Sequence, residues 1–543
     1  MTLMTLAFLA ALTAVQGQDP GRWLAPDTAR AVSRARSAQE AFEFDRRRRL
    51  PIVATSAGRC DERIGRFCYW YDERDTSLPT EPEPIRVARA RLNVNLAVAQ
   101  TEHPSSNWLL GQRVRYLLEH QQPDTGLTVA ARCGAAPWWC SALAGLSLHI
   151  AERFADADSA FEAALAQMPP ALRCTWTDWT VVFETKTADS IKALDCDGRR
   201  RAADSLFALA KPLLSEPGND LRTELLARRT MAALHSFARS PHFMPWGKDM
   251  EELMVRYGWS TNWSISDRPA SPYESAGVTG HQRSPAYQFF PTHNDDKSWT
   301  WNLKPERARF RYAPTYADEF TIVDDAQIAR FPRGDSTLIV AGAAIGPDTV
   351  VALTVVGSPH TAAVTVRADS TTRAGGLVVR MAGSPTLASL EIRTHRGRQI
   401  AVARLTFGAE TVRAPLVISD PLFFAVSDDL PETLEAAAAR ALAKNRFSKE
   451  APVGIFWEAT GQSPDSLEVA VSIVPIRRGF LGRLGEGLSL IKRRAPLTLQ
   501  WQARGGAFEL DLRRQKPGKY LLRLEAKAEA MTATSQRTFI LLP

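Results

Sequence analysis

Six cysteines are the residues whose spacing defines a chemistry most clearly. They are Cys60, Cys68, Cys133, Cys140, Cys174 and Cys196. Pairing each with its nearest neighbour gives Cys60–Cys68, Cys133–Cys140 and Cys174–Cys196, the simplest of the possible connectivities. A zinc site is the alternative, but the sequence lacks the C-x₂-C or nearby histidine spacing that such a site normally needs. The spacing therefore favours disulfides, which form in oxidising compartments.

A second set of reactive residues consists of His281, His293, Asp295 and Asp296. Imidazole and carboxylate groups can bind a divalent metal or act as an acid–base pair. The surrounding stretch carries aromatic residues that could line a sugar or peptide groove, namely Tyr287, Phe289, Trp299 and Trp301. The simpler interpretation is a turn in which these side chains cap backbone groups, and we favour it.

Established catalytic patterns are absent from the sequence. It contains no H-E-x-x-H, G-x-S-x-G, G-x-x-x-x-G-K-[ST] or G-x-G-x-x-G. The glycines at 482, 485 and 487 lack the strand–helix context of a phosphate-binding loop. We therefore assign no catalytic, cofactor-binding or metal-ligating residue, and we expect a protein that is not an enzyme and needs no cofactor.

Length and charge define the class of protein. The chain has 543 residues, of which 45% are hydrophobic and 23% charged, as in globular proteins of several domains. Its net charge of +8 is dispersed, which argues against nucleic-acid binding. One run, Arg46–Arg49, could contact an anionic lipid or polymer, although a solvated linker or a helix end is the commoner explanation.

The first residues predict export. Met4–Val15 is an apolar stretch with the length of a signal-peptide core, and Val15 and Gly17 fit a cleavage site before Gln18. A buried N-terminal helix is the alternative, because no Lys or Arg precedes Arg22. No later apolar run is long enough to span a bilayer, so we expect no transmembrane helix and a periplasmic or secreted protein.

Helical periodicity dominates residues 83–257, which follow a polar, basic segment at 18–82. Within residues 138–171, small and large residues recur at the spacing of a tetratricopeptide repeat. Those residues are Gly145, Leu148, Ala157, Phe161, Ala164 and Pro169. Small side chains at Gly145 and Ala157 allow two helices to cross closely, and Pro169 ends the second helix. An unrelated helical bundle is the alternative.

The pattern then changes to that of strands. Residues 258–319 form an aromatic-rich connector, and alternation with a period of two predicts β-sandwiches at 320–428 and 448–543. An Ala-rich helical linker at 429–447 separates them. The fold class we expect is therefore a multidomain chain, α and then β, in which a tetratricopeptide-like helical solenoid precedes two immunoglobulin-like β-sandwich modules.

The stretch Tyr257-Gly258-Trp259-Ser260-Thr261-Asn262 resembles the GWxTD motif of a family of bacterial exported proteins. Gly258, Trp259 and Thr261 match that motif, whereas Asn262 stands where the family has Asp. The stretch Ile418–Leu422 is similar to a second segment of that family. The resemblance implies helices before the motif and β modules after it, and it implies no particular reaction. Physically, Gly258 suits a helix end and Trp259 a core anchor.

These observations predict an exported bacterial scaffold or binding protein that is not an enzyme. Helical repeats present protein-binding surfaces, so we expect a protein or an envelope polymer as partner and no nucleic acid. The alternative is an extracytoplasmic hydrolase or carbohydrate-active protein that uses the His281–Asp296 connector. A structural component of a surface or secretion assembly is the third hypothesis.

Overall fold

The structure is a computed structural model whose chain divides into two compact units. The first unit contains Met1–Arg200 and Gly218–Ser284, and the second contains Arg201–Pro217 and Pro285–Pro543. The structure describes residues 24, 26, 29–53, 61–69, 78–266, 277–283, 285–295, 298–357, 363–369, 375–394, 396–407, 415–461, 467–476, 505–528 and 531–543. The expected signal peptide at 1–17 lies outside these residues.

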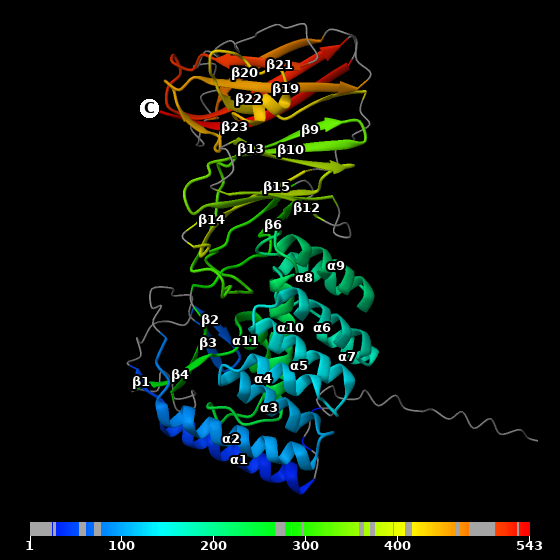
Figure 1. The fold of residues 1–543 in the computed structure, drawn as a ribbon, viewed down its shortest axis with the longest axis vertical. Coiled ribbons are helices and arrows are strands. Elements are labelled where there is room, and N and C mark those ends of the chain that lie inside the picture. Colours follow the sequence, from blue (N-terminus) through cyan, green and yellow to red (C-terminus); the bar gives the residue numbers. More distant parts are fainter. Residues whose placement is uncertain are drawn as a thin grey trace, which may run out of the picture. The chain divides into compact units, whose positions relative to one another are not determined.

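The first unit is mainly helical (Figure 1). Its helices are α1 (Arg30–Arg48), α2 (Glu83–Glu102), α3 (Asn107–Glu119), α4 (Pro123–Ala131), α5 (Pro137–Ile150), α6 (Phe154–Gln167), α7 (Pro170–Trp176), α8 (Thr185–Lys192), the start of α9 (Cys196–Ala210), α10 (Asp220–Ser236) and α11 (Lys248–Tyr257). Its strands are β1 (Ile52–Val53), β2 (Glu62–Ile64), β3 (Phe67–Tyr69), β4 (Asn262–Ser266) and β5 (Val278–His281). β2 and β3 form a hairpin, and β1, β4 and β5 form a small sheet.

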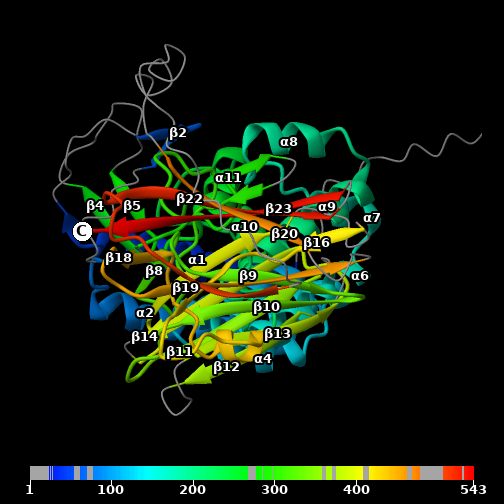
Figure 2. The same ribbon diagram turned by 90° about the horizontal axis from the view of Figure 1, so that it is seen from above.

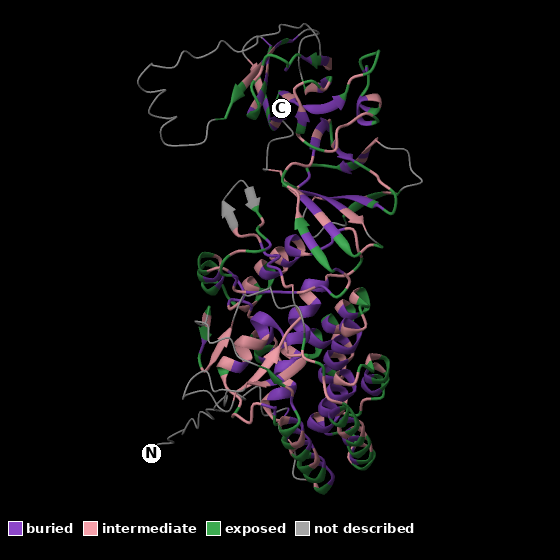
Figure 3. Ribbon diagram, turned by 90° about the vertical axis from the view of Figure 1, so that its left-hand side faces the viewer, coloured by how far each residue is buried: buried purple, intermediate pink, exposed green. Residues whose placement is uncertain are grey.

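Local signals explain where several of these helices begin. The Ser106 side chain accepts a hydrogen bond from the backbone N–H of Leu109 at the start of α3. Asn219 does the same for Arg222 at the start of α10. Such side-chain caps satisfy the backbone donors that the first helical turn leaves unpaired. Buried residues then follow the inner faces of the helices, as the colouring of Figure 3 shows.

Helix α1 lies inside the segment at 18–82 that the sequence analysis described only as polar and basic. Its composition is indeed polar, but Val32, Ala35 and Phe42 fall on one face and are buried. They join a core cluster that includes Leu92 of α2 and Trp108 of α3. The polar composition of this segment gave no sign of a helix, because only a narrow stripe of residues along α1 is apolar.

The second unit is built mainly of strands (Figures 1 and 2). In chain order they are β6 (His293–Asp295), β7 (Ser298–Thr300), β8 (Glu319–Ile322), β9 (Ile328–Arg333), β10 (Ser336–Ala343), β11 (Val350–Val356), β12 (Val364–Asp369), β13 (Gly375–Ala382), β14 (Leu387–Thr394), β15 (Gln399–Thr406), β16 (Leu416–Ile418), β17 (Leu422–Ala425), β18 (Arg446–Ser448), β19 (Val453–Gly461), β20 (Glu468–Pro475), β21 (Gly505–Leu510), β22 (Gly518–Ala528) and β23 (Met531–Leu542). The short helix α12 (Leu434–Ala438) lies between β17 and β18.

β6 and β7 pair with each other, and the other strands of this unit form two successive pairs of sheets. The first pair has the orders β13-β10-β9 and β12-β11-β14-β15-β8, and residues of both sheets share one hydrophobic cluster. The second pair has the orders β16-β19-β17, with β21 beside β19, and β18-β23-β22-β20, again around one cluster. Figure 2 shows the long strands β22 and β23, which pair antiparallel. An N-terminal helical region is thus followed by many strands in several sheets.

The helical linker expected at 429–447 is mostly not helical. Only Leu434–Ala438 forms a helix. Beyond it the backbone N–H of Leu442 donates to the carbonyl of Phe423, and Gln327 donates to the carbonyl of Leu442. The Ala-rich stretch therefore exchanges helical hydrogen bonds for bonds with neighbouring strands, a tertiary effect that overrides helix propensity.

Two further boundaries differ from the sequence analysis. The stretch Arg201–Pro217, expected within the helical repeats, belongs to the second unit. There the buried carboxylate of Glu391 on β14 accepts hydrogen bonds from the backbone N–H groups of Leu214 and Ser215. The connector at 258–319 is divided between the two units after Ser284, and it contains the short strands β4 to β7. Among the described residues, no helix is long and apolar enough to cross a membrane.

Candidate functional site

The structure places four of the six cysteines in two bonded pairs. Cys133 and Cys140 have Cα atoms 5.8 Å apart and join the end of α4 to α5. Cys174 and Cys196 have Cα atoms 5.6 Å apart and join α7 to the first residue of α9. Cys68 on β3 is disulfide-bonded, whereas Cys60 lies outside the described residues.

The repeat-packing residues lie where α5 and α6 cross. A Cβ atom on Gly145 would stand 2.8 Å from the Phe161 ring, so only glycine allows this approach. Ala157, Phe161 and Ala164 of α6 are buried, as is Leu148 of α5. Pro169 lies beyond the end of α6 and immediately precedes α7.

Two tryptophans at the start of α5 are buried rather than exposed. Trp139 donates from its indole nitrogen to the carbonyl of Asn107 at 2.9 Å. Trp138 makes an edge contact with the ring of Trp176, with centroids 5.8 Å apart. These side chains anchor α5 and do not offer a surface to a partner.

The GWxTD-like residues form the turn between α11 and β4. Gly258 follows the last residue of α11 with a φ of 92°, a conformation that favours glycine, and a Cβ there would meet the guanidinium of Arg228 at 3.3 Å. Trp259 is half-buried. Thr261 donates to the Asn262 side chain, whose amide in turn donates to the carbonyl of Pro79 at 3.0 Å. Asn262 thus ties β4 to the chain that leads into α2.

The His281–Asp296 cluster is divided between the two units. His281 lies on β5 of the first unit, where its Nε2 atom is 2.7 Å from the hydroxyl of Ser264. His293 and Asp295 lie on β6 of the second unit, and Asp296 falls outside the described residues. Within the described part of the chain, no group of three or more metal-ligating side chains was found.

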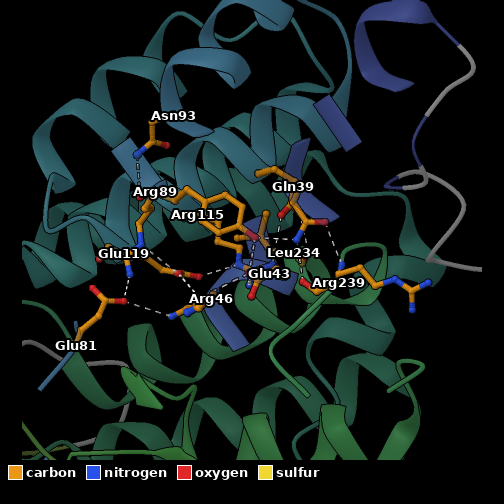
Figure 4. Close-up of polar contacts among 12 residues, drawn as sticks. Gln39, Glu43, Arg46, Glu81, Arg89, Asn93, Arg115, Glu119, Leu234 and Arg239 are labelled. Atoms are coloured by element: carbon orange, nitrogen blue, oxygen red, sulfur yellow. Dashed lines mark hydrogen bonds and ion pairs between the residues drawn. The ribbon is translucent and has the colours of Figure 1, made fainter. Parts of the chain in front are cut away.

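A dense group of charged side chains lies inside the described part of the first unit (Figure 4). Three arginines and three glutamates from α1, α2, α3 and the chain before α2 converge there. They are Glu43, Arg46, Glu81, Arg89, Arg115 and Glu119. The group has three positive and three negative charges, and four of these side chains are nearly inaccessible to solvent. Burying charges costs free energy unless every ion is paired.

Glu119 is the centre of this group. Its carboxylate lies 2.9 Å from Arg46 and 3.0 Å from Arg115, while its carbonyl accepts from Arg89 at 2.8 Å. Burial alone would raise the pKa of Glu119, but Arg46, Arg115 and Arg89 outweigh burial and hold this pKa well below its usual range. Burial would likewise lower the pKa of Arg46, yet Glu119 and Glu43 raise it. Figure 4 shows these side chains directed at one another.

Glu43 differs from Glu119 because burial dominates its titration. It is fully buried, and its carboxylate accepts from the Tyr116 hydroxyl at 2.6 Å and from Arg115 at 3.3 Å. Burial raises the pKa of Glu43 above its usual value despite Arg46 and Arg115. Gln39 completes the chain of contacts by donating to the Tyr116 hydroxyl at 2.8 Å and to the carbonyl of Arg239 at 2.9 Å.

A second buried network links the helical hairpin to the GWxTD-like turn. His149 of α5 lies 2.7 Å from Glu224 of α10. Arg228 donates to Glu224 at 2.5 Å and to the carbonyls of Val255 and Arg256 at the end of α11. Burial opposes ionisation of Glu224, but Arg228 and His149 lower its pKa to about 2. The network holds α5, α10 and α11 together beside Gly258.

Neither of these two buried networks was expected from the sequence. The run Arg46–Arg49 was expected to be a solvated linker or a helix end. It does lie at the end of α1, but Arg46 is buried and shares a helix face with buried Gln39, Phe42 and Glu43. That spacing of three and four residues was the available signal. These ion pairs join residues of α1, α2 and α3, so the arrangement positions those helices against one another.

Comparison with known proteins gives no family for this chain. No family model matches it, and no curated protein matches it. A solved segment of two fibronectin type-III domains from chicken tenascin is similar at 12% identity and a TM-score of 0.13, covering 40% of this chain and 98% of that chain. A TM-score of this size is too low to support an argument about the fold.

Proposed function

We propose that this chain is an exported bacterial scaffold or binding protein that engages a protein or envelope-polymer partner and is not an enzyme. The observation that carries the proposal is the close crossing of α5 and α6, in which the Phe161 ring fills the space left by Gly145. Stacked antiparallel helices of this kind form the extended surfaces that repeat proteins use for binding. Two cysteine pairs at bonding distance are compatible with export.

The finer architecture belongs to the same proposal. We infer a tetratricopeptide-like array, a GWxTD-like turn at Gly258, and two immunoglobulin-like sandwiches. The last is supported by Tyr520, whose hydroxyl donates to the carbonyl of Lys516 at 2.6 Å. A tyrosine that bonds back to the backbone a few residues upstream is a hallmark of immunoglobulin-like corners.

The outer face of α2 offers a contact surface for an apolar helix of a partner protein. Val87, Val94 and Val98 recur at helical spacing and remain 41%, 63% and 55% exposed. A stripe of valines exposed on one helix face is more apolar than a solvated helix needs. The buried side of the same helix carries Ile85, Leu92 and Leu96, so α2 has apolar residues on two faces.

The proposal is tested by covalent capture of partners in the native cell envelope. A photoreactive amino acid at Val94 of the full-length chain should form adducts that the double variant Val87→Asp/Val98→Asp abolishes. The matched control introduces Val364→Asp/Val366→Asp on β12, where two valines are similarly exposed. Adducts that survive the α2 variant, or that the β12 variant removes equally, contradict binding through this face.

The alternative is an extracytoplasmic hydrolase or carbohydrate-active protein that uses the His281–Asp296 connector. Within that connector His281 contacts the hydroxyl of Ser264, and a serine beside a histidine is the start of a nucleophilic site. Ser264 is only 2% exposed, so we expect no reaction with a serine-directed fluorophosphonate. Labelling of Ser264 in the native protein, detected by peptide mass spectrometry, would favour the hydrolase. A structural assembly component is distinguished by stable self-association on size-exclusion chromatography.

A further inference from the structure

A groove of about 650 Å³ lies in the second unit, between its two pairs of sheets. Its walls come from β8, β9 and β15 of the first pair and from β22 and β23 of the second. The charged residues of its lining are Asp324, Arg330, Arg404, Asp420 and Arg537. Three arginines against two aspartates leave one positive charge among the described lining residues.

Arg537 is the buried cation of this groove. It is 9% exposed, and it donates to the carbonyl of Ile328 at 2.7 Å and to the Asn445 side chain at 3.5 Å. Its Nε atom is buried and has no hydrogen-bond partner among the described residues. Burying this guanidinium is costly, and the charge of an anion bound in the groove would offset part of that cost.

The other two arginines each lie over an aromatic ring. The guanidinium of Arg330 lies 5.6 Å from the ring centre of Phe407, and that of Arg404 lies 5.3 Å from the ring centre of Trp301. Arg404 also donates to the carbonyl of Leu209 at 2.7 Å. Contacts of a guanidinium with a ring face fix its orientation before any ligand arrives, which lowers the entropy lost on binding.

We propose that this groove binds a carboxylate-bearing saccharide, that is, an acidic sugar unit of an envelope polymer. One carboxylate balances the single excess positive charge, and the planar guanidinium matches a carboxylate with two parallel hydrogen bonds. Asn445, Gln536 and Thr538 also line the groove, and their side chains donate and accept hydrogen bonds as sugar hydroxyls require. The volume falls within the usual range of ligand sites. The inference rests on the proposed binding of an envelope polymer.

An acidic peptide is the competing ligand, and the sheet edge argues against it. Extended peptides bind by adding a strand to an exposed sheet edge. The strand at the groove edge is β8, the last strand of its sheet. The backbone N–H of Phe320 on this strand already donates to the Tyr287 hydroxyl at 3.0 Å, so that donor is not available to an added strand.

Calorimetric titration of the full-length chain tests the assignment with three probes. These are a trisaccharide of hexuronic acid, the same trisaccharide with its carboxyl groups reduced to alcohols, and an acetylated tetraglycine with a free carboxylate. We expect the uronate to bind at least about tenfold more tightly than either of the others, and more weakly as salt is added. Arg330→Gln should weaken uronate binding by about tenfold. Arg380→Gln, an exposed arginine outside the lining, should leave binding unchanged.

If Arg330→Gln fails to fold, a second pair of variants tests whether the groove binds the uronate. Gln536→Glu places a negative charge on an exposed part of the lining and should weaken uronate binding by about threefold or more, whereas Thr532→Glu, on the same strand outside the lining, should not. Equal binding of the reduced sugar, preference for the peptide, or unchanged binding by Gln536→Glu would overturn the assignment. If the chain does not bind the uronate but still forms adducts through Val94 of α2, the groove assignment fails while the proposed binding function stands.

Discussion

At the scale of single residues, burial decides which polar groups matter. Arg46 belongs to a run of four arginines that resembles a solvated helix end, yet only the structure shows that its guanidinium is buried against Glu119. The face of α1 that carries Arg46 could be predicted from spacing, whereas its partners come from helices far away in the sequence. Gly258 was easier to predict, because a glycine directly after a helical stretch is a common terminating signal.

Gly258→Ala should destabilise the first unit by about 1–3 kcal/mol, because a Cβ at a φ of 92° is strained and crowds Arg228. Urea unfolding monitored by circular dichroism measures this change. Gly383→Ala is the control, since Gly383 has a φ of 77° but no atom within 4 Å of its added Cβ. An effect at Gly258 no larger than that at Gly383 would show that Arg228 is not crowded.

The two buried glutamates should respond differently to loss of charge. Glu119→Gln leaves Arg46 and Arg115 without their counterion and should cost about 3–5 kcal/mol. Glu43→Gln should cost clearly less, because burial already raises the pKa of Glu43 and disfavours its charged form. Equilibrium unfolding at pH 7 compares the two variants, and an equal or larger loss at Glu43 would contradict this ranking.

At the scale of helices and strands, the periodicity of apolar residues predicted the elements whose packing is local. It did not predict features that depend on residues far away in the sequence. The change to a period of two located the strand-rich part of the chain, because strands such as β13 alternate buried and more exposed residues. The linker helix was wrong in extent because neighbouring strands bond its backbone. The networks around Glu119 and Glu224 could not be predicted, since their members come from several helices.

Double substitution tests the crossing of α5 and α6. Gly145→Ala should cost about 1–3 kcal/mol, because its Cβ would stand 2.8 Å from the Phe161 ring. Combining it with Phe161→Leu should cost less than the sum of the two single losses, because the smaller side chain makes room. Gly506→Ala, whose Cβ meets no atom within 4 Å, should have little effect through crowding. Additive losses at Gly145 and Phe161 would contradict the close contact.

Lowering the pH should destabilise the helical unit over a defined pH range. Burial lowers the pKa of His242 from 6.5 to about 4, and it lowers that of His235 well below its usual value. Because the unfolded chain binds protons more readily at these sites, stability is complete above about pH 6.5 and falls between pH 6.5 and 4. The contribution of Glu224, with its pKa of about 2, is lost only as the pH falls further, from 4.5 toward 2.

Thermal unfolding between pH 7.5 and 4 measures this dependence. His242→Gln should reduce the change of the unfolding midpoint with pH, because glutamine does not titrate. The stability of this variant at pH 7 separately measures any loss of packing. A midpoint that stays constant from pH 6.5 to 4 in the unmodified chain would show that neither histidine is buried in its neutral form.

At the scale of the whole molecule, two units of different construction divide the proposed work. The helical unit carries the exposed valines of α2 that we propose as a protein-binding face, and the strand-built unit contains the groove lined by three arginines. The order of helices and then strands could be predicted from the change of period in the sequence. The assignment of Arg201–Pro217 to the second unit could not, because it depends on the hydrogen bonds that Glu391 accepts.

The central claim is that this is an exported, disulfide-braced binding protein, and a non-reducing peptide map of the protein from its native cell envelope tests it most directly. Mass spectrometry should find an N-terminus at Gln18 and linked peptides for Cys133–Cys140 and Cys174–Cys196. Tryptic peptides beginning at Met1 together with six free thiols would contradict export, and the partners proposed in the envelope would fall with it.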